Sequence, residues 1–201
     1  MIGDLRPWLD DQQSAWGRSV VYGIGGTVEE AAKGNASIGE QLPIAALIIV
    51  FLLIGQFNSF RKPTIILLTI PMGMIGVILG LIIARSFFGF VTLLGIIALA
   101  GIVINNAIVL LDRIKLEREV NGLTPQRAVI EAAQRRLRPI LLTTVTTLGG
   151  LLPLYLGGGP MYQPMAVAIM FGLIFATALT LGVVPVLYSL FFKVSFKDFV
   201  A

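Results

Sequence analysis

Two adjacent asparagines, Asn105 and Asn106, interrupt the apolar stretch GIVINNAIVLLDRIK. A second polar pair, Thr143 and Thr144, interrupts the later apolar stretch RPILLTTVTTL. An amide without a hydrogen-bond partner in an apolar medium costs about 2 to 7 kcal/mol. These four side chains, the polar seam, therefore either bond one another as packing contacts between helices or line a hydrated path for an ion or a proton.

The two pairs lie at matching depth if their segments are antiparallel helices. Asn105 lies seven residues before the next charge, or about 10 Å along the axis at 1.5 Å per residue. Thr143 and Thr144 lie five and six residues after Arg138, or about 8 to 9 Å by the same rise. One asparagine is thus expected to face the threonines, while the other faces a different helix.

The charges nearest the polar seam are Asp112 and Arg138, at the polar ends of the two segments. We expect them to form an interfacial ion pair across the loop. The apolar segments themselves offer no titratable group that would support proton transfer along the seam.

Composition excludes most soluble and catalytic classes. The chain of 201 residues is 56% hydrophobic and 13% charged, which is typical of an integral membrane protein. It has no histidine and no cysteine, and so lacks the commonest metal ligands and any disulfide. Neither a Walker loop nor a nucleophile elbow is present. We expect no enzymatic activity, cofactor, metal site or nucleic-acid partner. We expect the chain to lie in a lipid bilayer.

The seam must be positioned by membrane-spanning helices. A hydrocarbon core of about 30 Å requires roughly 20 apolar residues of helix. The sequence therefore predicts an all-α membrane bundle with five spans, over residues 42–57, 64–84, 88–111, 140–156 and 165–192. The motif GVILG (76–80) and the pair Gly172 and Ala176 have the small-residue spacing of close helix packing.

Basic residues gather on one side of this bundle. They concentrate in the connectors 58–63 and 112–139 and after the last span, including the tail 194–201, whereas the opposite connectors hold Arg85 alone. The positive-inside rule predicts a cytoplasmic location for the basic side, with the N-terminus outside and the C-terminus inside. Within the longer connector, Thr124 and Pro125 open a predicted surface helix, 124–136. Pro139 is expected to start the next span sharply.

The first 41 residues differ in kind from the rest. Residues 19–26 are predicted to form a short strand, and Thr27 with Glu30 forms a capping box that opens a helix toward Gln41. One strand and one helix bury too little apolar surface to fold alone. We expect the chain to be the C-terminal part of something larger, or to assemble with a partner.

Three long motifs occur in order: QFNSFRKPTIILLTIP (56–71), GIVINNAIVLLD (101–112) and RLRPILLTTVTTLGGLLPL (136–154). Over residues 22–193 the chain resembles the C-terminal half of permeases of the resistance-nodulation-division (RND) superfamily, in particular the multidrug pumps. The resemblance implies that the spans are the last five of twelve and that residues 1–41 end a periplasmic porter region. It also implies a homotrimeric, proton-driven pump of the bacterial inner membrane, working with a periplasmic adaptor and an outer-membrane channel.

Two departures from that pattern stand out. The paired membrane aspartates of the drug pumps belong to an N-terminal half that this chain does not contain. The position aligned with Asn105 is a lysine in those pumps, while Thr143 and Thr144 fall where the family has a relay hydroxyl. The leading hypothesis is a C-terminal fragment or split subunit of an efflux permease that needs its N-terminal half. The alternatives are a truncated membrane scaffold without transport activity and an exporter of heavy metals or other substrates.

Overall fold

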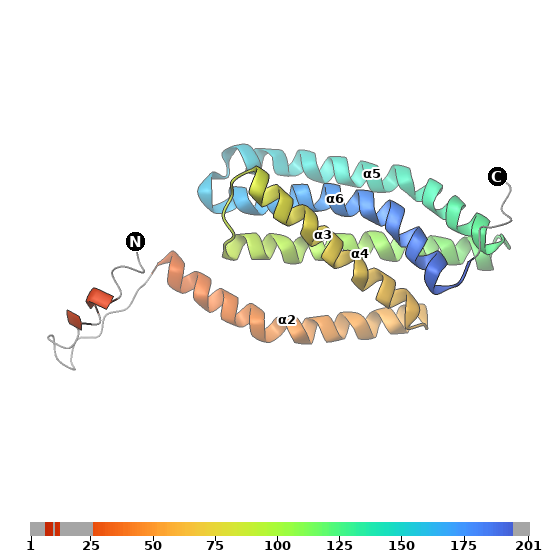
Figure 1. Ribbon diagram of the computed structural model, residues 1–201, viewed down its shortest axis with the longest axis horizontal. Helices are drawn as coiled ribbons and strands as arrows, with labels where there is room; N and C mark the ends of the chain where they lie inside the picture. Colours follow the sequence, from red (N-terminus) through yellow and green to blue (C-terminus); the bar gives the residue numbers. More distant parts are fainter. Residues whose placement is uncertain (1–6, 10, 13–25, 195–201) are drawn as a thin grey trace. The chain divides into compact units, whose positions relative to one another are not determined.

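A computed structural model describes residues 7–9, 11–12 and 26–194. Its long helices are α2 (Thr27–Phe57), α3 (Arg61–Ile83), α4 (Phe90–Glu119), α5 (Pro125–Gly157) and α6 (Gly159–Phe191), drawn in Figure 1. All five are long and apolar enough to cross a membrane, which confirms the predicted helical class and the five candidate spans. The predicted strand, 19–26, lies outside the described residues.

The chain divides into two compact units, Met1–Ala45 and Ala46–Ala201. In the first unit, the described part of α2 has an ion pair between Lys33 and Glu29, 2.6 Å apart and one helical turn apart. In the second unit, α6 packs against α3, α4 and α5 (Figure 1). The core of the second unit therefore forms around α6, whose buried residues include Val167, Leu173 and Val184.

Helices α3 and α6 approach each other closely because glycines line their contact. A Cβ built on Gly76 would lie 2.4 Å from the Cβ of Phe175, and one built on Gly80 would lie 2.4 Å from the Cβ of Phe171. On α6, a Cβ on Gly172 would meet the side chain of Leu99 at 2.3 Å. The close packing predicted from the small-residue spacing is confirmed.

Helix α5 continues through Pro139, where the sequence predicted a separate surface helix and a sharp start of the next span. It begins at Pro125, with Thr124 as the N-cap residue but without a capping hydrogen bond from its side chain. Four buried residues spaced by multiples of four, Ala128, Ala132, Ile140 and Thr144, form one stripe that runs across the proline. Burial of this stripe favours a continuous α5, which offsets the hydrogen bond that Pro139 removes.

Helices α2 and α4 also extend beyond the predicted spans. Thr27–Phe57 is a single helix that includes Pro43, so the helix predicted to run toward Gln41 is continuous with the first span. Likewise, α4 continues past Asp112 to Glu119. Helical hydrogen bonding does not require apolar side chains, so helices extend beyond the apolar stretch from which the spans were predicted.

Candidate functional site

Thr144 joins α5 to α6 inside the bundle. Its Oγ1 lies 2.9 Å from Oγ1 of Thr177 and 2.9 Å from the carbonyl oxygen of Ile140. Both threonines are buried. The hydroxyl of Thr144 is therefore satisfied by a partner on α6, which the sequence did not indicate. The sequence feature that could have indicated this partner is the pair Thr177 and Thr180, three residues apart in the apolar α6. Both side chains are buried.

Thr143 lies about 100° around α5 from Thr144. Its side chain is exposed, and its hydroxyl donates a hydrogen bond of 2.9 Å to the carbonyl of Ile140 in its own helix. That bond uses the hydroxyl proton but leaves the oxygen able to accept another. The structure thus separates the two threonines, since Thr144 packs inward and Thr143 faces outward.

The asparagines lie at the middle of α4, where Asn105 is about 22 Å from either end at 1.5 Å per residue. Val103 and Ala107 point into the core. Asn105 is two residues from each, about 200° around the helix, and its side chain is exposed while that of Asn106 is half-buried. Among the described residues neither amide is hydrogen-bonded, so this bundle does not itself bring Asn105 to Thr143 or Thr144.

Asp112 and Arg138 do not form the expected ion pair among the described residues; both side chains are exposed. The arginine of α5 that reaches across to α4 is instead Arg135, whose Nε is 3.6 Å from Oε1 of Glu117. Arg138 lies one helical turn after Arg135. The buried stripe of Ala128, Ala132, Ile140 and Thr144 fixes the rotation of α5 about its axis, and with this rotation Arg135 is the arginine that contacts α4.

Glu117 is the most deeply buried charged side chain described, with 1% of its surface exposed. Arg113 contacts its Oε1 at 2.6 Å, and the Nδ2 of Asn121 donates to its Oε2 at 2.5 Å. Arg135 also pairs with Glu131 at 2.6 Å, which extends the network along α5. These side chains fasten the end of α4 to α5, and a carboxylate with three partners tolerates this burial.

The spacing of this network was present in the sequence, since Arg113, Glu117 and Asn121 are four residues apart and lie on one helix face. The spacing did not indicate that this face packs against a second helix, because i, i+4 pairs of this type also form on exposed helix faces. No group of three or more His, Cys, Asp or Glu side chains among the described residues is arranged to hold a metal ion.

Residues 11–192 match the family model described as the AcrB/AcrD/AcrF family. The chain is 36% identical over 179 residues to the swarming motility protein SwrC of Bacillus subtilis, an alignment that covers 87% of this chain and 17% of that protein. It is also 36% identical over 196 residues to the multidrug resistance protein MdtC of Escherichia coli, covering 91% of this chain and 19% of MdtC.

A crystal structure of a heavy metal efflux pump has the same fold over this region. The superposition has a TM-score of 0.73 at 30% sequence identity and covers 94% of this chain and 20% of that pump. The chain thus spans less than a fifth of the length of the curated relatives quoted above.

Proposed function

Because the chain belongs to the AcrB/AcrD/AcrF family of RND transporters, we propose that it is the five-helix C-terminal part of a proton-coupled efflux permease. Its cargo would be drugs or other amphiphiles, as the name of MdtC indicates for that relative. The part that transports would include further helices supplied by a fragment or subunit resembling the N-terminal half of the RND permeases.

The exposed amide of Asn105 is the observation that supports this proposal best. It lies at the middle of α4 and faces away from the core of the bundle. In contact with lipid chains, an unsatisfied amide at this depth would cost about 2 to 7 kcal/mol. A neighbouring helix that carries carboxylates, or water in a polar path, would satisfy it. Intramembrane polar groups of this kind ordinarily face a bundle interior or a cavity.

Thr143 is the other side chain of the predicted polar seam that faces outward. Its exposed oxygen can accept a hydrogen bond, whereas Thr144 is occupied by Thr177. We assign the relay hydroxyl to Thr143 for this reason. Asn105 cannot take up a proton, so in this scheme it donates hydrogen bonds to a carboxylate whose charge changes during transport, and the carboxylate itself carries the proton.

We expect Asn105→Leu to slow efflux by on the order of tenfold or more, because a hydrogen bond to a charged carboxylate contributes about 1.5 to 3 kcal/mol. Asn105→Gln should retain most activity because it keeps the amide. The measurement is efflux of a fluorescent amphiphile from cells that co-express this chain with the fragment supplying the remaining helices.

Leu94→Ala provides the matched control, since Leu94 is another exposed side chain of α4, at 40%. Wild-type efflux in both Asn105→Leu and Thr143→Val would refute the polar seam. If no pair of fragments transports, including the wild type, the truncated-scaffold alternative is favoured instead.

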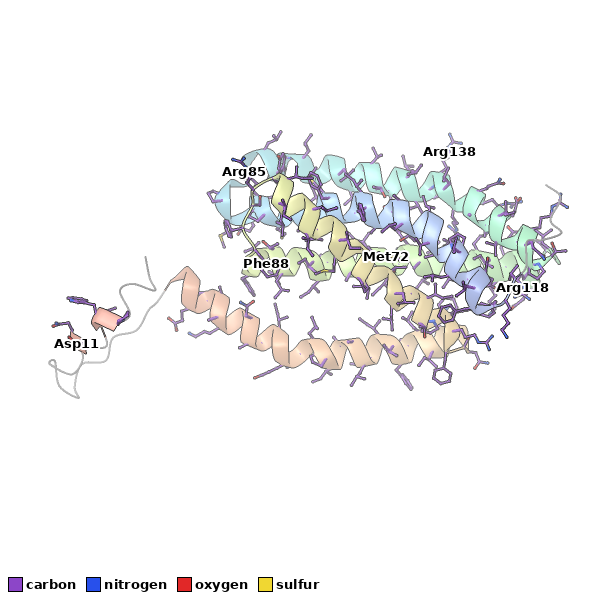
Figure 2. All side chains as sticks on the ribbon, in the orientation of Figure 1. Asp11, Met72, Arg85, Phe88, Arg118 and Arg138 are labelled. Atoms are coloured by element: carbon purple, nitrogen blue, oxygen red, sulfur yellow. The ribbon has the colours of Figure 1, made fainter. Side chains whose placement is uncertain are left out.

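We further propose that the permease lies in the bacterial inner membrane, with the N-terminal end periplasmic and the C-terminal end cytoplasmic. Support comes from the basic residues near one end of the bundle, such as Lys62, Lys115 and Arg118. Figure 2 shows Arg118 and Arg85 at opposite ends of this unit. A homotrimer that works with a periplasmic adaptor and an outer-membrane channel is the assembly the family resemblance favours.

Orientation can be tested cleanly because the chain has no native cysteine. Phe87 and Val120 are 60% and 72% exposed and lie in the connectors before and after α4. In intact cells, a membrane-impermeant maleimide is expected to label Phe87→Cys and not Val120→Cys, and to label both after permeabilisation. Labelling of Val120→Cys alone in intact cells would reverse the proposed topology.

Heavy-metal export is the second candidate, supported by the likeness to the heavy metal efflux pump. Thiolate and imidazole ligands are absent from this chain, so metal ligands would have to come from the other fragment. Parallel measurement of metal and amphiphile export by the same co-expressed pair distinguishes the two candidates.

A further inference from the structure

A pocket of about 370 Å³ lies where the ends of four helices meet, on the side of the bundle that holds Arg118 (Figure 2). It is lined by the end of α2 and the following turn, the start of α3, and the last turns of α4 and α6. The lining residues are Phe57, Asn58, Ser59, Lys62, Lys115, Arg118, Glu119, Tyr188 and Phe192. Its volume falls within the range of small-ligand pockets, roughly 300 to 1,000 Å³.

Lys62 is the side chain in this pocket that most requires a partner. It is 9% exposed, and among the described residues its ammonium forms neither an ion pair nor a hydrogen bond. The ammonium lies 5.4 Å from the centre of the Phe57 ring, a contact that is favourable but does not neutralise the charge. Burial of an ammonium group without an ion-pair partner is unfavourable.

The other charges in the pocket increase this need. Lys115 and Arg118 repel the Lys62 ammonium, while the attraction comes from Glu119 and, more weakly, from Asp112. Glu119 is itself shared with Lys115, with an N···O distance of 3.9 Å. Three cationic side chains therefore face one carboxylate, and the pocket has an unmatched positive charge.

Tyr188 adds a directional donor to the pocket. Its hydroxyl oxygen accepts a hydrogen bond of 3.1 Å from Arg118, which leaves the hydroxyl proton available to a ligand. Phe192 stacks on the Tyr188 ring with centroids 4.5 Å apart and holds that ring in place. The pocket thus combines cations and a hydroxyl donor with an aromatic wall.

We propose that this pocket binds a phosphate group, and that in the membrane the group is the headgroup phosphate of an anionic phospholipid. Phosphate oxygens accept charge-assisted hydrogen bonds from lysine and arginine, so they would supply the counter-charge that Lys62 lacks. The site lies beside the ends of apolar helices, the level at which lipid headgroups lie, and basic pockets between spans are suited to such headgroups. Phe57 and Phe192 would contact the glycerol and the start of the acyl chains. The proposal does not depend on transport.

The test uses the full chain purified in detergent, with three probes: phosphatidylglycerol, phosphatidylcholine and inorganic phosphate. Binding is measured by native mass spectrometry and by the shift in apparent Tm. Phosphatidylglycerol should bind and raise the Tm more than phosphatidylcholine does, and inorganic phosphate should compete with it. Lys62→Met should bind phosphatidylglycerol about tenfold more weakly, the effect of losing one charge-assisted contact.

Lys115→Gln is a second variant, since Lys115 is partly exposed and its replacement is compatible with folding. Arg127→Gln removes an exposed charge outside the pocket and should bind as the wild type does. Equal binding of phosphatidylglycerol by the wild type and by folded Lys62→Met and Lys115→Gln would overturn the site. Binding of inorganic phosphate without phosphatidylglycerol would overturn the lipid assignment.

Discussion

Gly76→Ala is expected to weaken the packing of α3 on α6 and to lower the apparent Tm of the purified chain by several degrees. The added Cβ would lie 2.4 Å from the Cβ of Phe175 and 2.8 Å from the carbonyl oxygen of Phe171. A backbone carbonyl cannot move aside without displacing α6. Overpacking of this kind costs about 1 to 3 kcal/mol, which exceeds the roughly 1 kcal/mol that alanine gains over glycine in a helix.

Gly101→Ala and Gly149→Ala are the matched controls, because a Cβ at either position meets nothing within 4 Å. There the helix propensity of alanine acts alone, and the Tm should stay the same or rise slightly. The measurement is fluorescence-detected size-exclusion chromatography after heating. If Gly76→Ala and Gly101→Ala had the same Tm, the close approach of α3 and α6 would be wrong.

Glu117→Leu is expected to loosen the end of α4 from α5 and to lower the apparent Tm by several degrees. The substitution removes the carboxylate that Arg113 and Arg135 contact at 2.6 and 3.6 Å, and so leaves the Arg113 guanidinium without its counter-ion. Removing one partner of a buried ion pair destabilises a protein more than replacing both partners with apolar residues does. The same heating assay measures the effect.

Arg138→Leu is the control on the neighbouring helix α5, since the Arg138 side chain is exposed and forms no ion pair among the described residues. Substitution of such a surface side chain usually changes stability little, so the Tm should barely change. The double variant Arg113→Met with Glu117→Leu should recover part of the loss. Equal effects at Glu117 and Arg138 would contradict a specific role for the buried network.

Much of the architecture was predictable because it depends on local composition. Five apolar stretches, separated by polar connectors, predict five helices whatever their neighbours are. The small-residue spacing of Gly76 and Gly80 likewise predicted a close contact, although not that Phe171 and Phe175 would fill it. Helix ends were harder to predict: α5 runs through Pro139 because a buried stripe on both sides of the proline favours one continuous helix.

The candidate site was predictable in its residue types but not in its pairing. The polar side chains inside the apolar stretches could be identified from the sequence: they are Asn105, Asn106, Thr143 and Thr144. Their distances from the charged ends of the helices predicted that the two pairs lie at the same depth. Depth along a helix does not determine rotation about its axis, and rotation decides what each side chain meets. In the folded protein Asn105 faces outward, and Thr144 pairs with Thr177 instead.

By itself, the sequence determined that this is a chain of apolar helices long enough to span a membrane, with polar side chains inside the apolar stretches and basic residues at one end. Hydropathy and charge are properties of each segment, so they do not depend on the fold. Only the tertiary structure decided that Glu117 is enclosed by Arg113, Asn121 and Arg135 and that Lys62 is buried without a counter-ion. Those features depend on the meeting of helix faces from distant parts of the chain, which is set by how the whole bundle packs.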